Sequence, residues 1–173
     1  MALKATIFKA DLQIAAMDRN HYADHGVTLA RHPSETDERM MVRLLAFALF
    51  SDDALAFGKG LCVDDEPDLW IRDLTGAVEL WIDVGLPDDK WTRKASARAR
   101  QADVWWQQVG DKLARLDNVR VLRLAPEATQ ALAAMARRTM RLQCTIQDGH
   151  VWITDGEATV QVEPEPLLPR SAA

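Results

Sequence analysis

The pattern of apolar and polar positions predicts a β-hairpin at the start of the chain. Residues 2–14 alternate loosely between apolar and polar, and a second run follows over 22–30 after the polar stretch 18–20. A strand with one buried face repeats every two residues, so two such runs around a polar connection are typical of paired antiparallel strands. We therefore expect an N-terminal hairpin.

A helix is predicted next, over residues 34–50. Ser34 is placed to cap its first turn, Asp37 stands at the third helical position, and the run to Phe50 is strongly apolar. Spacings of three and four residues direct one stripe toward the core, formed by Glu38, Met41, Val42, Leu45, Ala48 and Leu49. A charged face lies opposite, formed by Glu35, Arg39 and Arg43. Glu38 is thus a carboxylate expected on the core side.

The rest of the pattern predicts a mixed α/β (α+β) protein with a mixed β-sheet. In chain order we expect strands at 61–63, 69–71 and 78–84, a helix from Pro87 or Asp88 to about 109, a strand at 119–124, a helix from 126 to about 138, and strands at 141–147, 150–154 and 157–162. The last three strands surround two Asp-Gly turns and predict a C-terminal β-meander. Residues 164–173 contain three prolines and are expected to be a loop or disordered.

Length and composition favour one soluble domain. The chain has 173 residues, 48% of them hydrophobic and 27% charged, and we place a single domain at residues 1–163. The longest apolar run, 40–50, is too short for a membrane span, and the first residues lack the apolar core of a signal peptide. Two cysteines exclude a disulfide framework and a thiolate zinc site. We therefore expect a cytoplasmic protein that does not enter a membrane.

Charge is distributed unevenly along the chain. The net charge is -5, yet residues 91–141 hold 11 Lys and Arg against 4 Asp and Glu, whereas residues 1–90 hold 9 against 17. A basic segment often forms only a solvated face. The same segregation also suits a metal-dependent phosphodiesterase, in which a basic flank binds phosphates beside an acidic centre. Charge alone leaves both interpretations open.

The most informative segment is 68–84, where a short loop joins two strands. The second strand has an apolar face formed by Val78, Leu80, Ile82 and Val84. Aligning this face with the apolar face of the first strand fixes the register of the hairpin. The resulting register pairs Arg72 with Glu79, Trp70 with Trp81 and Asp68 with Asp83.

This register places two carboxylates opposite each other. The Cβ atoms of such a pair are about 5 Å apart, and like charges at that distance destabilise a sheet. A divalent cation that takes carboxylate oxygens compensates Asp68 and Asp83 together. Alternatively, both lie at a solvated strand end or are neutralised by a cation such as Arg72. Glu38 has two similar interpretations: metal binding, or a place in the first helical turn where it favours the helix dipole and reaches water.

The same residues resemble a known superfamily. A helix, three antiparallel strands with Pro67-Asp68 and Asp83-Val84-Gly85, a helix and a strand together resemble the PD-(D/E)xK nucleases. More narrowly, the phrases HPSETDERMMVRLLAFAL, EPDLW and ELWIDVGLPDD resemble the YaeQ family of small bacterial proteins over nearly the whole chain. The resemblance implies a restriction-endonuclease-like αβββαβ core. It also implies Mg²⁺ or Mn²⁺ held by Asp68, Asp83 and the Val84 carbonyl, with Glu38 as the acid of the first helix.

One position departs from the superfamily pattern. A lysine should stand two residues after Asp83, and Gly85 occupies that place. Hydrolysis of a phosphodiester needs a positive group near the developing charge, and some members supply it from the following helix. There Lys90 and Lys94 share one face, and we prefer Lys94, with a merely solvated lysine as the alternative.

Nucleic-acid contacts are expected beside this acidic pair. Arg93 and Arg98 belong to the basic segment, and Gln101 lies four residues before Trp105 in a spacing that some nuclease relatives share. Trp70 and Trp81 have two interpretations, since indole rings either stack on bases or pack against each other across strands.

The remaining motifs are less informative. His21 and His25 are four residues apart, which suits a metal pair on a helix, but their segment predicts a strand or loop and we assign no metal there. The sequence shows no glycine-rich phosphate loop and no nucleophile-base-acid set. We therefore expect a divalent-metal-dependent nuclease or a nuclease-related protein. The alternative is a catalytically silent nuclease-fold module that binds nucleic acid or a protein partner, which Gly85 favours.

Overall fold

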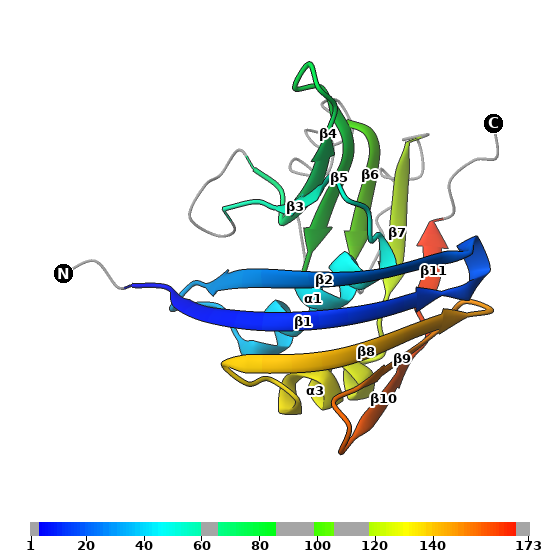
Figure 1. The fold of residues 1–173 in the computed structure, drawn as a ribbon. Coiled ribbons are helices and arrows are strands. Elements are labelled where there is room, and N and C mark those ends of the chain that lie inside the picture. Colours follow the sequence, from blue (N-terminus) through cyan, green and yellow to red (C-terminus); the bar gives the residue numbers. More distant parts are fainter. Residues whose placement is uncertain (1–3, 60–65, 86–98, 106–117, 169–173) are drawn as a thin grey trace. The chain divides into compact units, whose positions relative to one another are not determined.

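The computed structural model describes residues 4–59, 66–85, 99–105 and 118–168 (Figure 1). Contacts divide the chain into two compact units. Unit 1 comprises Met1–Ser51 and Ala125–Glu163, and unit 2 comprises Asp52–Leu124 and Pro164–Ala173. The protein is mixed α+β and mostly strand, with parallel and antiparallel pairs in both sheets, which confirms the predicted class. That residues 1–163 form one domain stays a prediction.

Unit 1 contains a five-stranded sheet in the order β10-β9-β8-β1-β2 (Figure 1). Its strands are β1 (Thr6–Ala16), β2 (His21–Arg31), β8 (Thr139–Gln147), β9 (His150–Thr154) and β10 (Thr159–Val162). The predicted hairpin is confirmed as β1 with β2, and the predicted meander as β8 with β9 and β10. A parallel pair of β1 with β8 joins hairpin and meander into one sheet.

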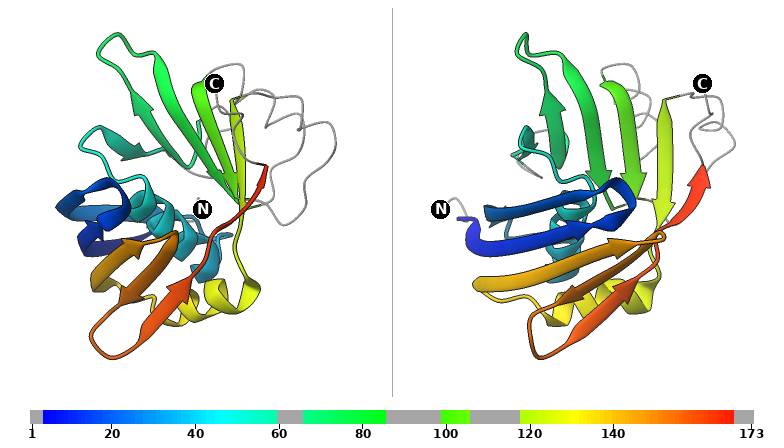
Figure 2. Two further views of the ribbon diagram at one scale, coloured as in Figure 1. Left: turned by 90° about the vertical axis from the view of Figure 1, so that its right-hand side faces the viewer. Right: turned by 45° about the vertical axis from the view of Figure 1, so that its right-hand side comes forward.

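Two helices cover one face of the unit 1 sheet, α1 (Asp37–Leu49) and α3 (Pro126–Ala134) (Figures 1 and 2). The strands bury alternate apolar side chains, among them Phe8, Leu12 and Ile14 of β1 and Met140, Leu142 and Cys144 of β8. Alternate burial is what a sheet with one covered face requires. In the described part of the chain, no helix is long and apolar enough to cross a membrane.

The start of α1 differs from the predicted one. The N-cap is Thr36, whose side-chain oxygen accepts a hydrogen bond from the Arg39 N–H, and the helix begins at Asp37. Ser34 instead lies before the helix, with its hydroxyl 2.6 Å from His32 Nδ1. Both Ser and Thr are N-cap residues by type, and here the Ser34 hydroxyl bonds locally to His32 while Thr36 caps the helix. Glu38 does lie in the first turn, as expected.

The sequence predicts a charged face opposite the core at Glu35, Arg39 and Arg43, and this prediction is wrong for Glu35 and Arg43. Glu35 and Arg43 are buried, at 7% and 2% exposed, and form an ion pair in which Arg43 Nε and Nη2 each donate to one Glu35 oxygen at 2.8 Å. Arg43 Nη2 also donates to the Ala30 carbonyl, and Arg39 donates to Glu35. A bidentate pair with its remaining hydrogen bonds satisfied offsets much of the cost of removing both charges from water.

Unit 2 contains a six-stranded sheet in the order β11-β7-β6-β5-β4-β3 (Figure 2). Its strands are β3 (Leu55–Phe57), β4 (Leu69–Arg72), β5 (Val78–Val84), β6 (Ala99–Trp105), β7 (Val119–Arg123) and β11 (Glu165–Leu168). Strands β3, β4 and β5 are antiparallel neighbours, whereas β5, β6 and β7 are parallel. The predicted strands at 69–71, 78–84 and 119–124 are confirmed.

Two predictions for unit 2 are wrong. Residues 99–105, expected in the helix up to 109, form β6, because strands on both sides supply backbone hydrogen-bond partners that outweigh local helix propensity. Residues 165–168, expected as a loop or disordered, form β11 against β7. The predicted strand at 61–63 and the rest of the predicted helix lie outside the described residues.

Candidate metal centre

The hairpin of β4 and β5 positions the candidate site. Leu69 lies opposite Ile82, Trp70 opposite Trp81 and Ile71 opposite Leu80, as predicted. The register then shifts, so that Arg72 faces Val78 instead of Glu79. Two features hold the loop between the strands in a tight turn. The Asp73 carboxylate accepts hydrogen bonds from Thr75 and Ala77. Gly76 adopts a φ of +88°, which residues with a side chain rarely adopt.

Asp68 and Asp83 lie at the same end of this hairpin. Asp68 directly precedes Leu69, and Asp83 directly follows the partner of Leu69. Both are buried, at 5% exposed each. The Val84 N–H donates to Asp68 Oδ2 at 2.8 Å, which ties the first carboxylate to the strand that carries the second. The structure thus brings the two predicted acidic ligands to neighbouring strands of one unit.

A side chain of β5 orients Asp83. Trp81 Nε1 donates to Asp83 Oδ2 at 2.7 Å, and Trp81 is itself only 1% exposed. Residues two apart on a strand share a face, so the indole and the carboxylate are neighbours by construction. The hydrogen bond fixes one oxygen of Asp83 in a buried place without adding a charge.

The donor set fits a hard divalent cation. Magnesium takes oxygen ligands and often uses only one or two carboxylates, completing its octahedron with water and substrate phosphate. Two buried carboxylates on adjacent strands match that demand. Within the described ranges there is no group of three or more His, Cys, Asp or Glu side chains that could hold a metal, so further ligands would come from backbone carbonyls such as that of Val84, from water or from substrate.

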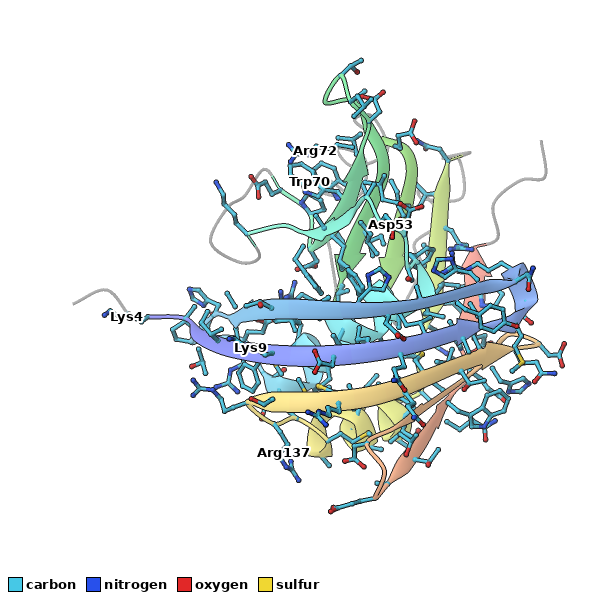
Figure 3. All side chains as sticks on the ribbon, in the orientation of Figure 1. Lys4, Lys9, Asp53, Trp70, Arg72 and Arg137 are labelled. Atoms are coloured by element: carbon cyan, nitrogen blue, oxygen red, sulfur yellow. The ribbon has the colours of Figure 1, made fainter. Side chains whose placement is uncertain are left out.

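An aromatic and cationic surface lies further along β4. The Arg72 guanidinium is 4.2 Å from the centre of the Trp70 ring, and Trp70 meets Trp81 edge to face at 6.3 Å between ring centres. Figure 3 labels Trp70 and Arg72 side by side on this strand. Trp70 is half-buried and Trp81 almost fully buried, so of the two tryptophans Trp70 has more surface open to a ligand.

The other predicted site residues have different surroundings. Glu38 belongs to unit 1, where its Oε1 accepts a hydrogen bond from the Thr129 hydroxyl. Gln101 lies in β6 rather than on a helix. Lys90, Lys94, Arg93 and Arg98 lie outside the described residues. Gly85, two residues after Asp83, has a φ of +106°.

Cysteine chemistry finds no support at the described cysteine. Cys144 is a free thiol buried in unit 1, and burial raises its pKa to about 12. A thiol with so high a pKa stays protonated at neutral pH and is a poor nucleophile. Cys144 therefore acts as a small apolar core residue.

The sequence reasoning missed a polar cluster in unit 1. The hydroxyl of Ser51 lies between the rings of His21 and His25, two histidines in a segment for which the sequence predicts a strand or loop and no metal. The available signal was the period of two in a strand, which places residues four apart on the same face. What no local pattern indicated was that Ser51, thirty residues away from His21, would lie between them.

Comparisons with known proteins agree on one family. The chain matches the family model described as YaeQ protein over residues 1–164. It is 46% identical over 172 residues to "Uncharacterized protein YaeQ" of Escherichia coli strain K12, covering 94% of this chain and 95% of that protein. The protein of the same name from Salmonella typhi is 44% identical over 173 residues, with 94% and 96% covered.

Solved structures give the same result. The crystal structure of YaeQ protein from Xanthomonas axonopodis pv. citri superposes with a TM-score of 0.90 at 49% identity, covering 95% of this chain and 98% of that one. The YaeQ protein from Pseudomonas syringae also gives a TM-score of 0.90, at 33% identity with 95% and 97% covered. A match of sequence and fold over nearly the full length of both chains shows that this protein belongs to the YaeQ family.

Proposed function

We propose that this protein is a divalent-metal-dependent nuclease of the PD-(D/E)xK type, which hydrolyses phosphodiester bonds with Mg²⁺ or Mn²⁺. The observation that carries the proposal is the pair of buried carboxylates, Asp68 and Asp83, at the same end of neighbouring strands. Two buried carboxylates on neighbouring strands supply the oxygen ligands that a divalent cation takes, and such a cation would offset their mutual repulsion.

Each residue would have a defined task. Asp68, Asp83 and the Val84 carbonyl would hold the ion, and the Trp81 indole keeps Asp83 in place through its hydrogen bond. When bound, the ion would supply Lewis acidity and lower the pKa of a water molecule that it coordinates. Lys94 would stabilise the negative charge that develops on the phosphate.

Nucleic acid would be held beside the acidic pair. Trp70, with the Arg72 guanidinium over its ring, offers an aromatic surface for stacking and a positive charge for phosphate. Contacts to the sugar-phosphate backbone of the nucleic acid would come from Arg93, Arg98 and Gln101. The buried free thiol of Cys144 and the low cysteine count support a reducing cytoplasm as the location.

Gly85 favours a second candidate, a silent nuclease-fold module that binds nucleic acid or a protein partner. A φ of +106° is a conformation that glycine adopts readily and that a lysine there would adopt only under strain. The backbone conformation at this position therefore favours glycine over lysine. Catalysis then depends on whether a lysine from elsewhere, Lys94 in our proposal, replaces the missing charge.

The test is a calorimetric titration of Mn²⁺ into the protein, followed by cleavage assays on single- and double-stranded DNA and RNA. The wild type should bind Mn²⁺ saturably and cut at least one substrate, and Asp83→Asn should lose both. Asp53→Asn is the matched control, since Asp53 is an exposed carboxylate of the same unit (Figure 3). Circular dichroism should show the same fold in all three proteins.

The outcomes separate the two candidates. Cleavage by Asp83→Asn at the wild-type rate would eliminate the nuclease proposal. Saturable Mn²⁺ binding and nucleic-acid binding without cleavage would favour the silent module. Loss of cleavage in Lys94→Ala with Mn²⁺ binding intact would assign the missing charge to Lys94.

A further inference from the structure

Two histidines of unit 1 converge on one buried serine. His21 Nε2 is 3.0 Å and His25 Nε2 is 2.8 Å from the same atom, Ser51 Oγ. Ser51 is fully buried, at 0% exposed, and both histidines are half-buried. The distance between the two ring nitrogens therefore cannot exceed the sum of these two hydrogen-bond distances.

The spacing of His21 and His25 along β2 does not by itself bring their rings together. Residues four apart on a strand have Cα atoms about 13 Å apart, since each residue advances about 3.3 Å. Both rings must therefore lean along β2 toward each other. Ala23 lies between them on the same face, and its small side chain leaves room for the Ser51 hydroxyl.

The hydrogen bonds of the cluster depend on the tautomers of the two histidines. A serine hydroxyl donates one hydrogen, so it satisfies at most one of the two Nε2 atoms as an acceptor. When both rings are neutral, either both Nε2–H groups donate to the two lone pairs of the Ser51 hydroxyl, or one Nε2–H donates and the other Nε2 accepts the hydroxyl hydrogen. Both nitrogens can point a lone pair inward once an ion takes the place of the shared hydrogens.

We propose that His21, His25 and Ser51 form a binding site for a borderline divalent cation, Zn²⁺, Ni²⁺ or Cu²⁺. Imidazole nitrogens are preferred ligands of these ions, whereas Mg²⁺ and Mn²⁺ prefer oxygen. The two Nε2 atoms are the ligands, the Ser51 hydroxyl is a weaker third donor, and water completes the coordination. This site is chemically distinct from the carboxylate pair of unit 2.

Neighbouring contacts hold the cluster in shape. The Phe47 ring packs edge to face on His25 at 5.2 Å between ring centres. Arg19 Nη1 donates to the Ser51 carbonyl at 3.0 Å and fixes the backbone at that residue. With only two imidazole ligands, we expect a weaker affinity than that of a structural zinc site with four protein ligands.

The test titrates Zn²⁺, Ni²⁺ and Cu²⁺ separately into untagged full-length protein by calorimetry. We expect one saturable site for each ion, with an affinity at least about tenfold lower in His21→Ala and in His25→Ala. Loss of a group that only hydrogen-bonds to a metal ligand already lowers metal affinity by about that factor. The chain has four histidines, and the other two provide matched controls. His32→Ala and His150→Ala should bind like the wild type.

Electron paramagnetic resonance counts the imidazole ligands directly, so the test does not depend on the folding of the alanine variants. Bound Cu²⁺ should show nitrogen hyperfine splitting from two imidazoles in electron paramagnetic resonance, and from one in His25→Gln, which retains a hydrogen-bonding group toward Ser51. Absence of a saturable site for all three ions would overturn the proposal. So would equal losses in His150→Ala and His25→Ala.

The result is independent of the proposed nuclease. Asp83→Asn should retain Zn²⁺ binding while losing Mn²⁺ binding, and His25→Ala should show the reverse. Loss of Zn²⁺ binding in Asp83→Asn would contradict two separate sites. A failed Mn²⁺ titration with a successful Zn²⁺ titration would reject the nuclease proposal and leave this site in place.

Discussion

Glu35 in unit 1 and Asp68 in unit 2 are buried to a similar degree, yet the neighbouring groups that the structure describes for them differ. Glu35 accepts hydrogen bonds from the Arg43 guanidinium on both oxygens, so negative and positive charges are buried together. Asp68 accepts a hydrogen bond from the backbone of Val84, and its neighbour across the hairpin end is a second carboxylate, Asp83. Among the described groups, Glu35 thus lies beside a guanidinium, whereas Asp68 lies beside a backbone N–H and a second carboxylate.

This difference separates a stabilising role from a functional one. Breaking a buried opposite-charge pair costs stability, whereas neutralising one of two like charges relieves repulsion. The Glu35–Arg43 pair should therefore behave as part of the fold. The Asp68–Asp83 pair should behave as a site whose charge is kept for a cation, and four measurements can break or sharpen this contrast.

The largest effect is expected at Arg43. Arg43→Met leaves Glu35 buried beside Arg39 alone and should lower the free energy of unfolding by about 3 kcal/mol, measured by urea denaturation. Arg39→Ala is the control, because Arg39 is partly exposed and should cost less than about 1 kcal/mol. The double variant Glu35→Gln/Arg43→Met should recover part of the loss. Equal stability of Arg43→Met and wild type would show that the Glu35–Arg43 pair does not stabilise the fold.

A slightly smaller effect is expected from Mn²⁺ on Asp68→Asn. At a hundredfold excess over its Kd, Mn²⁺ should stabilise the wild type by about 2.7 kcal/mol, whereas Asp68→Asn should gain nothing. In EDTA the variant should be as stable as the wild type or more stable by up to about 1 kcal/mol, since one of two like charges is gone. Thermal unfolding with and without Mn²⁺ measures both. Marked destabilisation of the variant in EDTA would indicate a structural carboxylate instead.

The neutral donor can be tested at Trp81. Trp81→Phe keeps an aromatic ring in the core but removes the N–H that donates to Asp83, and should cost about 2 kcal/mol in urea denaturation. Adding Asp83→Asn to this variant should reduce the penalty, because a neutral amide tolerates the missing donor better than a carboxylate does. Additive losses in the double variant would mean that the two side chains do not act as a pair.

The smallest effect concerns an exposed carboxylate. Backbone N–H groups of Gly149 and Asp148 hold the pKa of Asp18 below its ordinary value. A carboxyl with a lowered folded pKa contributes stability above its unfolded pKa and loses it as pH falls through the folded value. Asp18→Asn should therefore be less stable than wild type near pH 6 and approach it below about pH 4. Asp24→Asn, at an exposed position of the following strand β2, is the control and should keep the wild-type dependence of melting temperature on pH.

Local pattern was enough for the elements whose partners are close in sequence. The register of Trp70 with Trp81 followed from a period of two and a short loop, and the Asp-Gly turns marked the meander. Helix α1 followed from its apolar spacing. The same reasoning placed Asp68 next to Asp83, because both lie on one hairpin whose register has little freedom.

The tertiary structure decided every feature that depends on distant partners. The parallel pairing of β1 with β8 joins segments about 130 residues apart, and the strand β6 forms because β5 and β7 lie on either side of it. Glu35 and Arg43 look like a solvated face in the sequence, since periodicity does not tell how many sides of a helix are covered. His21, His25 and Ser51 meet only because chain folding brings the end of α1 to β2. A local pattern records the preference of each residue, whereas burial and contact depend on what the rest of the chain packs against it.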